Sequence, residues 1–354
     1  TGASITLVRK PQWWGRHLKE AANQAWPDKI VFTVIKDMEP LVLALKKQDI
    51  DVSMELSTSA LNKLRKRAYF NRAYYSEYVG SFSYTYMGMN MKPEGGRTPF
   101  FTDLRVRRAM AHLVPVDEII QVSARGIGKR IASFGMPGQA DYNEAIPLVE
   151  PDIEEASRLL NEAGWVDTDG DHIRDKIIDG KKVPFSFSLS YMISPVTKEI
   201  AQIIRNNMYK AGIEVKADPM DFVVFYKQAA AHAFDAMLGS WSSSAGAEDP
   251  RQLWHTESWA NNGSNFTGFG NAYTDSLIQV MNQEMNPGKR SRMMKQFQAI
   301  VAEEQPYVFM YNATRKIAIH KRFDHARIYP ERPHVILNNL RLASKYRNSS
   351  PDNY

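Results

Sequence analysis

The chain has 354 residues, a formal net charge of +6 and no cysteine. This length exceeds what a single hydrophobic core usually organises, so two domains are expected. The missing cysteines exclude disulfides, thiolate nucleophiles and cysteine-based zinc sites. No apolar run of about 18 residues occurs, so no membrane-spanning helix is expected, and the modest charge does not by itself predict nucleic-acid binding.

The first part of the chain alternates strand and helix patterns. Apolar and β-branched residues predict strands over residues 4–10 and 29–35. Residues 39–48 carry apolar side chains at helical spacing, and residues 50–56 predict a further strand. The last three segments are therefore expected to form a β-α-β unit.

Two helices are predicted from their N-cap residues. Asp103 precedes a helix whose apolar positions face inward and whose polar side carries three arginines, Arg105, Arg107 and Arg108. Asp152 and Glu155 have the spacing of a capping box, and Gly164 ends that second helix as a C-terminal glycine does.

The second half of the chain predicts an open sheet. Ser194 and Pro195 begin a helix that ends before Gly212, and Asp221 begins the next helix. Strands are predicted before, between and after these helices, over residues 185–192, 213–218 and 234–238. Two β-α-β crossovers in series imply an α/β sheet with helices on both faces. Beyond them, a helix is expected over 289–304 and a strand over 307–320.

The stretch "LGSWSSSAGAEDPRQLW" is a candidate ligand site. It places Trp241 at the end of a predicted strand, followed by small residues over 242–246. Ligands of open α/β sheets bind beyond the carboxyl ends of strands, and small residues allow a ligand to approach the backbone. The alternative is that Trp241 packs under an ordinary loop.

The stretch "DTDGDHIRD" resembles a calcium loop. Asp167, Asp169 and Asp171 have the alternate spacing of oxygen ligands. His172 and Ile178 stand where an EF-hand has its glycine and its bidentate glutamate, which favours a solvated turn instead. No cofactor is expected, and calcium at the three aspartates is the alternative.

Other motifs predict neither nucleic-acid binding nor catalysis. Residues 61–75 mix basic and aromatic side chains, but a solvated helix face followed by a strand explains them better than a nucleic-acid surface. The chain contains no H-E-x-x-H and no G-x-S-x-G motif, and the pair Gly126 and Gly128 lacks the third glycine of a dinucleotide fingerprint.

Several motifs, in their order along the chain, carry a resemblance. They are "ITLVRKPQWWG", "VFTVIKDMEPLVLALKKQDIDVSMEL", "YMGMNMKPEGGRTPFFTDLRVRRAMAHLVPVDEII", "EASRLLNEAGW", "AGIEVKADPMDFVVFYKQ", "FDAMLGSW" and "NGSNFTGFGNAYTDSLIQ". Together they resemble the extracytoplasmic solute-binding proteins of peptide-type ABC importers, the family of dipeptide- and oligopeptide-binding proteins (solute-binding family 5). The match covers nearly the whole chain, and its order makes it specific.

The resemblance implies an α/β fold of the type II periplasmic-binding-protein kind, with two lobes that close over a ligand. Residues 1–88 and 312–354 would form the remainder of lobe one, and residues 89–311 would form lobe two. Family members are longer at the N-terminus, so this chain is expected to lack the first strands of lobe one and a small inserted domain. A periplasmic or extracytoplasmic monomer that serves an ABC transporter permease is implied, with membrane anchoring through a missing lipoprotein segment as an option.

The resemblance also implies where a ligand binds. Peptide binders of the family carry an aspartate three residues after the strand-end tryptophan, for the ligand's amino group, but this chain has Ser244 there. Glu248 or Asp249 would take over that charge, or the ligand has no free amine and is an oligosaccharide or another polar solute. The expected ligand-binding residues are Trp241, Ser242, Ser243, Ser244, Glu248, Asp249, Asn265, Phe266, Tyr86 and Asn90.

A hydrolase is the alternative class of function. It would use Asp249, His255 and a serine of the loop after Trp241, but the spacing of these residues does not require it. The expectation is therefore a binding protein without catalytic residues.

Overall fold

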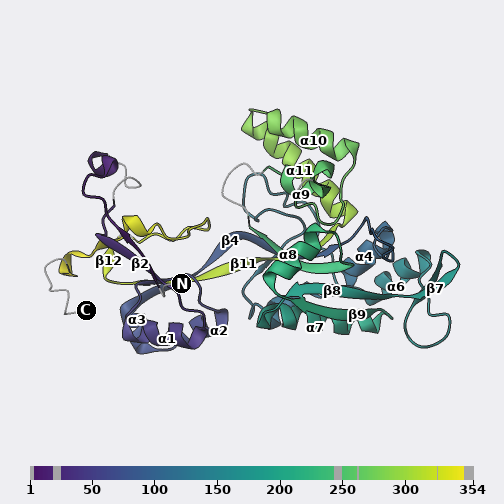
Figure 1. Cartoon of the computed structure of the whole chain (residues 1–354), viewed down its shortest axis with the longest axis horizontal. Coiled ribbons are helices and arrows are strands. Elements are labelled where there is room, and N and C mark those ends of the chain that lie inside the picture. Colours follow the sequence, from purple (N-terminus) through teal and green to yellow (C-terminus); the bar gives the residue numbers. More distant parts are fainter. Residues whose placement is uncertain (1–3, 19–24, 243–248, 261–262, 325, 347–354) are drawn as a thin grey trace. The chain divides into compact units, whose positions relative to one another are not determined.

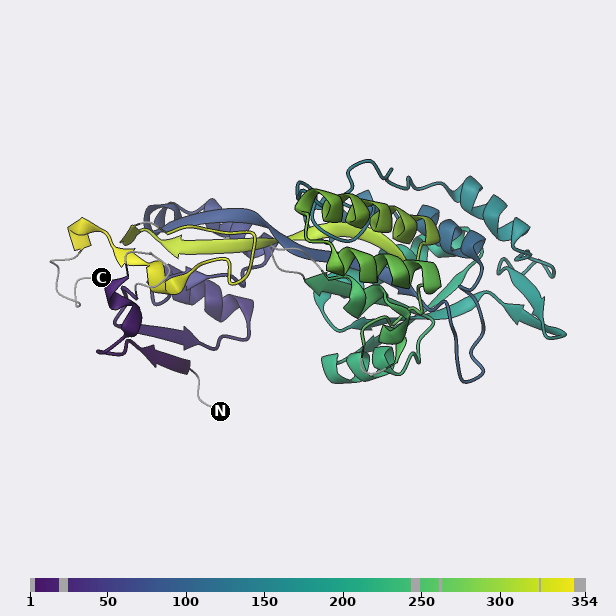
Figure 2. The same ribbon diagram turned by 90° about the horizontal axis from the view of Figure 1, so that it is seen from above.

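The computed structural model describes residues 4–18, 25–242, 249–260, 263–324 and 326–346. The chain forms two compact units, Thr1–Ser81 with Thr314–Tyr354, and Phe82–Ala313. Strands β4 (Tyr74–Met89) and β11 (Tyr307–His320) are neighbours in the main sheet and contribute residues to both units (Figures 1 and 2). The expected lobe boundaries also fall within or next to these two strands. In the described residues, no helix combines the length and the apolar character needed to cross a bilayer.

The first unit differs from the sequence-based expectation in its pairing. Strand β1 (Ser4–Val8) pairs antiparallel with β2 (Lys29–Thr33), whereas β3 (Val52–Ser53) pairs with β11. The expected β-α-β unit is therefore wrong, because β2 and β3 belong to different sheets. Helix α1 (Met38–Lys47) does follow β2, but a crossover requires both strands in one sheet.

One buried cluster of the first unit is mainly helical, and another contains Ile317 and Ile319 of β11. The fully buried residues of the helical cluster include Leu45 of α1, Leu61 of α2 (Thr58–Arg65) and Phe70 of α3 (Ala68–Ala73). The remaining elements are short: β12 (Phe323–Asp324), β13 (Arg341–Leu342) and the 3-10 helices Trp14–His17, Leu337–Asn339 and Ser344–Tyr346.

The second unit confirms both predicted crossovers. Strand β8 (Ser186–Met192) pairs in parallel with β9 (Glu214–Met220) and with β10 (Ala236–Ser242), and β10 pairs antiparallel with β4. The connections are helices α7 (Pro195–Lys210) and α8 (Phe222–Ala230), which lie on opposite sides of these strands (Figure 1). The carboxyl ends of β8, β9 and β10 therefore share one edge of the sheet.

The predicted N-caps are confirmed as side-chain hydrogen bonds. Asp103, Asp152, Ser194 and Asp221 each accept a hydrogen bond from a backbone N–H in the first turn of the following helix. The other elements of this unit are α4 (Leu104–Leu113), α5 (Val116–Val122), β5 (Lys129–Arg130), α6 (Ile153–Glu162), β6 (Asp175–Ile178), β7 (Lys181–Pro184), α9 (Arg251–Trp254), the 3-10 helix Thr256–Trp259, α10 (Ala272–Gln283) and α11 (Pro287–Glu304).

Arg107 corrects the expectation of three arginines on the polar side of α4. Its side chain is only 3% exposed, whereas Arg105 and Arg108 are 48% and 44% exposed. The Arg107 guanidinium donates to the backbone oxygens of Phe101, Thr102 and Glu304 at 2.8–2.9 Å. It is buried because these carbonyls, which have no helical partner, satisfy its donors. Burial lowers the pKa of Arg107 from its usual value, and the Glu304 carboxylate partly offsets this.

Candidate ligand-binding site

Trp241 is half-buried near the end of β10, opposite Tyr84 of β4. Its ring is stacked at 5.7 Å between centroids on Phe266 and lies nearly parallel to Tyr86 at 6.4 Å. Its indole N–H donates to the Tyr307 hydroxyl at 3.2 Å. The three partners fix the orientation of the ring, which stays partly exposed. We call Trp241, Tyr86, Phe266 and Tyr307 the Trp241 wall.

A glycine makes room for the wall. Gly239 lies directly opposite Tyr86 in the β10–β4 ladder, and a Cβ at Gly239 would be 2.4 Å from Cζ and Oη of Tyr86. Real Cβ atoms do not approach other heavy atoms so closely. The Tyr86 ring, which is stacked on Tyr307 at 3.9 Å, therefore lies across a backbone position that only glycine permits.

The wall is uncharged. Burial raises the pKa of Tyr307 to about 12, with hydrogen bonds to Trp241 and Tyr86 acting in the opposite direction. Burial also raises the pKa of Tyr86 well above its usual value. Both phenols stay protonated in any physiological medium, so these two buried side chains place no charge beside Trp241.

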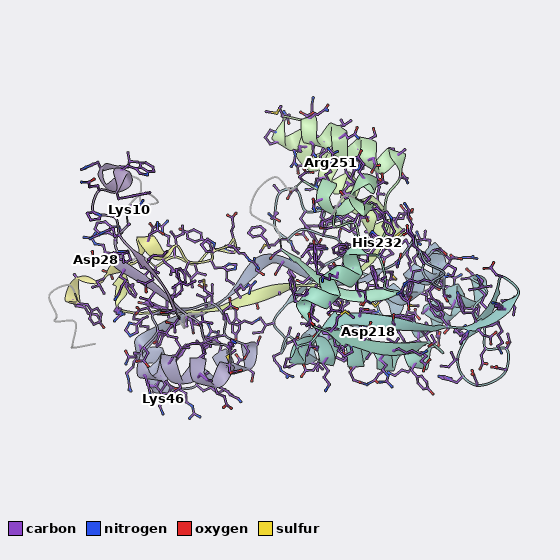
Figure 3. All side chains as sticks on the ribbon, in the orientation of Figure 1. Lys10, Asp28, Lys46, Asp218, His232 and Arg251 are labelled. Carbon is purple, nitrogen blue, oxygen red and sulfur yellow. The ribbon has the colours of Figure 1, made fainter. Side chains whose placement is uncertain are left out.

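The segment that carries Phe266 is held by buried polar groups. Asn265 is 1% exposed, and its side-chain amide donates to the backbone oxygens of His255 and Phe269. The ring nitrogens of His232, labelled in Figure 3, lie 3.2 Å and 2.7 Å from the backbone oxygens of Phe266 and Trp259. These contacts place Phe266 against Trp241 and leave Asn265 committed inside the protein.

Two exposed aromatic residues extend the wall along α8. Tyr226 contacts Phe266 edge-on at 5.9 Å, and Phe222 is stacked on Tyr226 at 6.3 Å. Their exposed fractions are 45% and 66%. Both residues belong to the helix that was predicted to begin at Asp221, but the sequence pattern did not link them to Trp241. The sequence did not indicate Tyr307 either, because it lies 66 residues after Trp241 and no local pattern shows that the two side chains meet.

The structure brings together three of the ten expected ligand-binding residues, Trp241, Tyr86 and Phe266. Ser242 is exposed at the end of β10. Asn90 is 2% exposed, and its side-chain amide donates to the backbone oxygens of His232 and Phe234. Tyr86 and Phe266 are 1% and 3% exposed. A direct ligand contact of these two residues, of Asn90 or of Asn265 stays a prediction. Ser243, Ser244 and Glu248 lie outside the described residues.

The carboxylate of Asp249 forms hydrogen bonds within the protein. Its Oδ1 accepts hydrogen bonds from the Arg251 backbone N–H at 2.9 Å and from the Asn282 side-chain amide at 2.8 Å. These bonds tie the start of α9 to α10. A role for Asp249 toward a ligand amine stays a prediction.

The acidic loop, residues 167–175, is paired with the side chain of Lys182. The carboxylates of Asp167, Asp169 and Asp175 come within 4.8 Å of one another, but the Lys182 ammonium lies 2.5 Å from Asp169 and 3.2 Å from Asp175. Asp171 stands outside this group and accepts from the Ile173 backbone N–H. Calcium at the predicted aspartates would have to compete with Lys182.

Replacing Lys182 by methionine should lower the melting temperature at pH 7. Burial opposes ionisation of Asp175, but hydrogen bonds from Thr168 and the Lys182 ammonium outweigh it and lower the pKa of Asp175. A carboxyl with a lowered pKa stabilises the folded state above its unfolded pKa and loses that contribution on acidification. The difference between the two proteins should therefore shrink below about pH 4.

The matched control is Lys181→Met, at an exposed residue one position before Lys182. We expect millimolar calcium to raise the melting temperature of Lys182→Met and to leave the parent protein unchanged. A calcium-dependent rise in the parent protein would show that Lys182 does not fill the cation position.

The sequence of residues 1–264 matches the family described as bacterial extracellular solute-binding proteins, family 5 Middle. The match covers well over half of the chain. This chain belongs to that family.

Relatives of this solute-binding protein include two peptide-binding proteins. The oligopeptide-binding protein AppA of Bacillus subtilis (strain 168) is 28% identical over 329 residues, which are 90% of this chain and 58% of the relative. The di/tripeptide-binding protein 1 of Pseudomonas aeruginosa (strain UCBPP-PA14) is 26% identical over 307 residues, 86% of this chain and 53% of the relative. The chain thus spans somewhat more than half the length of these curated relatives.

Solved structures confirm the fold expected for a family 5 solute-binding protein. AppA from Bacillus subtilis, solved with a bound nonapeptide, matches with a TM-score of 0.78 and 27% identity over 97% of this chain and 64% of that chain. NikA from Brucella suis, solved with Fe(III)-EDTA, matches with a TM-score of 0.78 and 20% identity over 97% and 66% of the two chains. The expected α/β, type II periplasmic-binding-protein fold is confirmed.

Proposed function

We propose that this solute-binding protein binds a peptide outside the cytoplasm, against the Trp241 wall, and delivers it as a monomer to an ABC transporter permease. The observation that carries the proposal is the half-buried Trp241 ring, fixed by three aromatic neighbours at the carboxyl edge of the sheet. The relative AppA is an oligopeptide-binding protein, and its structure holds a nonapeptide.

The accessible aromatic surface suits peptide side chains. It consists of the half-buried Trp241 ring and the exposed rings of α8, whereas Tyr86, Phe266 and Tyr307 are buried. Aromatic faces bind apolar and aromatic groups of many shapes, and rigid rings lose little conformational entropy when they do so. The exposed rings of Tyr226 and Phe222 continue this surface. Since the wall carries no charge and Oδ1 of Asp249 is used within the protein, we expect affinity to depend more on Trp241 than on Asp249.

An oligosaccharide or another polar solute is the second candidate. A tryptophan ring also packs against the apolar face of a sugar, and Trp241 is reachable in the same way by either ligand. The relative NikA, solved with Fe(III)-EDTA, supports a wider range of solutes on this fold.

The described residues support binding without catalysis. His255, which a hydrolase would need as a base, is 2% exposed, and its Nδ1 accepts the Glu257 backbone N–H at 3.2 Å. Asp249 is bound to Arg251 and Asn282. Neither residue has the open, mutually oriented geometry of a general base and its partner.

Calorimetry with a peptide panel tests the proposal. Trp241→Ala should weaken binding of the best peptide by about 30-fold, which corresponds to about 2 kcal/mol, because a buried aromatic anchor contributes this much. The affinity of Trp241→Phe should lie between the affinities of Trp241→Ala and the parent protein, since this variant keeps a ring and loses the hydrogen bond to Tyr307. Asp249→Asn should have a smaller effect than Trp241→Ala.

Tyr209→Ala is the matched control, because Tyr209 is a 55% exposed aromatic residue of α7 whose ring contacts His172 at a tilt and does not contact the wall. It should bind peptide as the parent protein does. Heat from an oligosaccharide panel with none from any peptide would rule out the peptide and leave the second candidate. Equal affinities of Trp241→Ala and the parent protein would remove the wall from the site.

A further inference from the structure

A polar pocket of about 240 Å³ lies in the first unit, where α1 ends beside α3 and the end of β11 (Figure 1). Six of its seven lining residues carry a nitrogen or a hydroxyl group in the side chain, and none of the seven is acidic. The lining residues are Gln48, Tyr69, Arg72, Ala73, His320, Lys321 and Tyr346. All of them belong to the first unit, whereas the residues of the Trp241 wall belong to the second. The pocket is therefore a site of its own.

His320 forms one fixed side of the pocket and orients Gln48. His320 is 8% exposed, and its Nδ1 accepts the Arg322 backbone N–H at 3.0 Å. Burial and the nearby Arg322 charge lower the pKa of His320, so the ring is neutral at pH 7 and carries its proton on Nε2. Nε2 donates to Oε1 of Gln48 at 2.8 Å. The NH2 group of Gln48, which has no partner within the described residues, is left as a donor in the lining.

Two cations line the pocket without a carboxylate partner within the described residues. The Lys321 ammonium donates to the Asn71 backbone oxygen at 2.5 Å and lies 5.0 Å from the centre of the Tyr75 ring. These contacts hold Lys321 at the pocket and leave it further N–H groups for a ligand. Arg72 is exposed on α3, and its guanidinium forms no hydrogen bond or ion pair in the part of the chain that the structure describes.

The surroundings of the pocket add positive charge rather than a counter-ion. Residues 61–73, which include all of α3 and part of α2, carry five cations and no carboxylate. The cations are Lys63, Arg65, Lys66, Arg67 and Arg72. Asp51, whose backbone oxygen accepts the His320 backbone N–H, is itself bound through Oδ2 to Arg322 at 2.6 Å. An anion in the pocket would therefore neutralise cations that lack a partner.

We propose that this pocket binds a phosphate group, either soluble phosphate or the phosphate of a lipid headgroup. A phosphate monoester carries about −1.5 to −2 charges at pH 7, which matches the two cations Arg72 and Lys321. Its oxygens accept hydrogen bonds from the guanidinium, the ammonium and the NH2 group of Gln48. The site goes beyond the proposed function and does not depend on the ligand of the Trp241 wall.

Calorimetric titration of the whole chain with inorganic phosphate, at constant ionic strength, tests the site. We expect saturable binding, and acetate should bind at least about ten-fold more weakly because it offers one charge and two oxygens. Arg72→Gln should weaken phosphate binding about ten-fold or more, the effect of one charge-assisted hydrogen bond. Gln48→Glu keeps an oxygen for His320 and replaces the NH2 donor by a charged oxygen, so it should abolish phosphate binding.

Arg67→Gln and Asn62→Asp are the matched controls. They make the same two charge changes at exposed residues outside the lining, and Asn62→Asp keeps the acceptor for the Tyr78 hydroxyl. Each should change the phosphate dissociation constant by less than about two-fold, because salt screens charges that do not touch the ligand. Trp241→Ala should bind phosphate as the parent protein does, which separates this test from the test of the proposed function.

Flotation with phosphatidylcholine vesicles that contain phosphatidic acid distinguishes the two sources of phosphate. Vesicle binding that Arg72→Gln reduces and Arg67→Gln preserves would assign the lipid headgroup. Saturable binding of inorganic phosphate without vesicle binding would assign the soluble anion. Absence of both, equal affinities for acetate and phosphate, or equal losses in Arg72→Gln and Arg67→Gln would overturn the site.

Discussion

Replacing Arg107 by methionine should lower the free energy of unfolding by about 3–5 kcal/mol, because one buried and two partly buried carbonyl oxygens lose their donor at once. The guanidinium connects the loop before α4, at Phe101 and Thr102, with the end of α11 at Glu304. Methionine preserves the apolar stem of the side chain, so the loss measures the polar contacts. Urea unfolding followed by circular dichroism gives the free-energy difference.

Arg108→Met is the matched control, one residue further along α4. Arg108 is 44% exposed and reaches the Glu303 backbone oxygen at 3.5 Å and its carboxylate at 3.7 Å, so its loss should change the free energy of unfolding by less than about 1 kcal/mol. The free energy of unfolding of Arg107→Lys should lie between those of the two methionine variants, since an ammonium lacks the planar fork with which the guanidinium reaches three carbonyls. Equal stabilities of Arg107→Met and Arg108→Met would contradict the buried role of Arg107.

Replacing Gly239 by alanine should cost about 2–3 kcal/mol of stability and disturb the Trp241 wall. The new Cβ would meet Cζ and Oη of Tyr86 at 2.4 Å. The Tyr86 ring has no free space to move into, because it is 1% exposed and stacked on Tyr307 at 3.9 Å. We expect a lower urea midpoint, a shift of the tryptophan fluorescence and weaker ligand binding.

A double-mutant cycle isolates this contact. Tyr86→Leu removes the atoms that the new methyl group would strike, so Gly239→Ala should cost much less in the Tyr86→Leu background than in the parent protein. Gly288→Ala is the control substitution, because a Cβ at Gly288 in α11 has its nearest neighbour at 3.4 Å. Additive effects of Gly239→Ala and Tyr86→Leu would show that the strain lies elsewhere.

Many elements of the second unit could be predicted from short-range sequence patterns. The caps at Asp103, Asp152, Ser194 and Asp221 and the two crossovers could be predicted because a cap and a helical stripe involve residues within one or two turns. The parallel pairing of β8 with β9 and with β10 follows from the two helical crossovers, because such connections join parallel strands. Motif order along the chain was enough to indicate the family.

Pairing and burial between distant residues could not be predicted in this way. Strand β2 pairs with β1 rather than joining β3, because the choice of partner depends on which edges the rest of the fold leaves open. The sequence also gave no sign that Arg107 is buried, since its burial depends on carbonyl groups of Phe101, Thr102 and Glu304 that come together only in the folded chain.

The candidate site likewise combines features set by local sequence with features set by tertiary contacts. The sequence by itself determined that Trp241 stands at the end of a strand and that an aspartate is absent at position 244. Only the tertiary structure decided that Tyr307 bonds Trp241, that Gly239 makes space for Tyr86, and that Lys182 supplies the cation of the acidic loop. Local spacing specifies which groups a strand or loop presents, whereas packing between segments far apart in the chain specifies which of those groups meet.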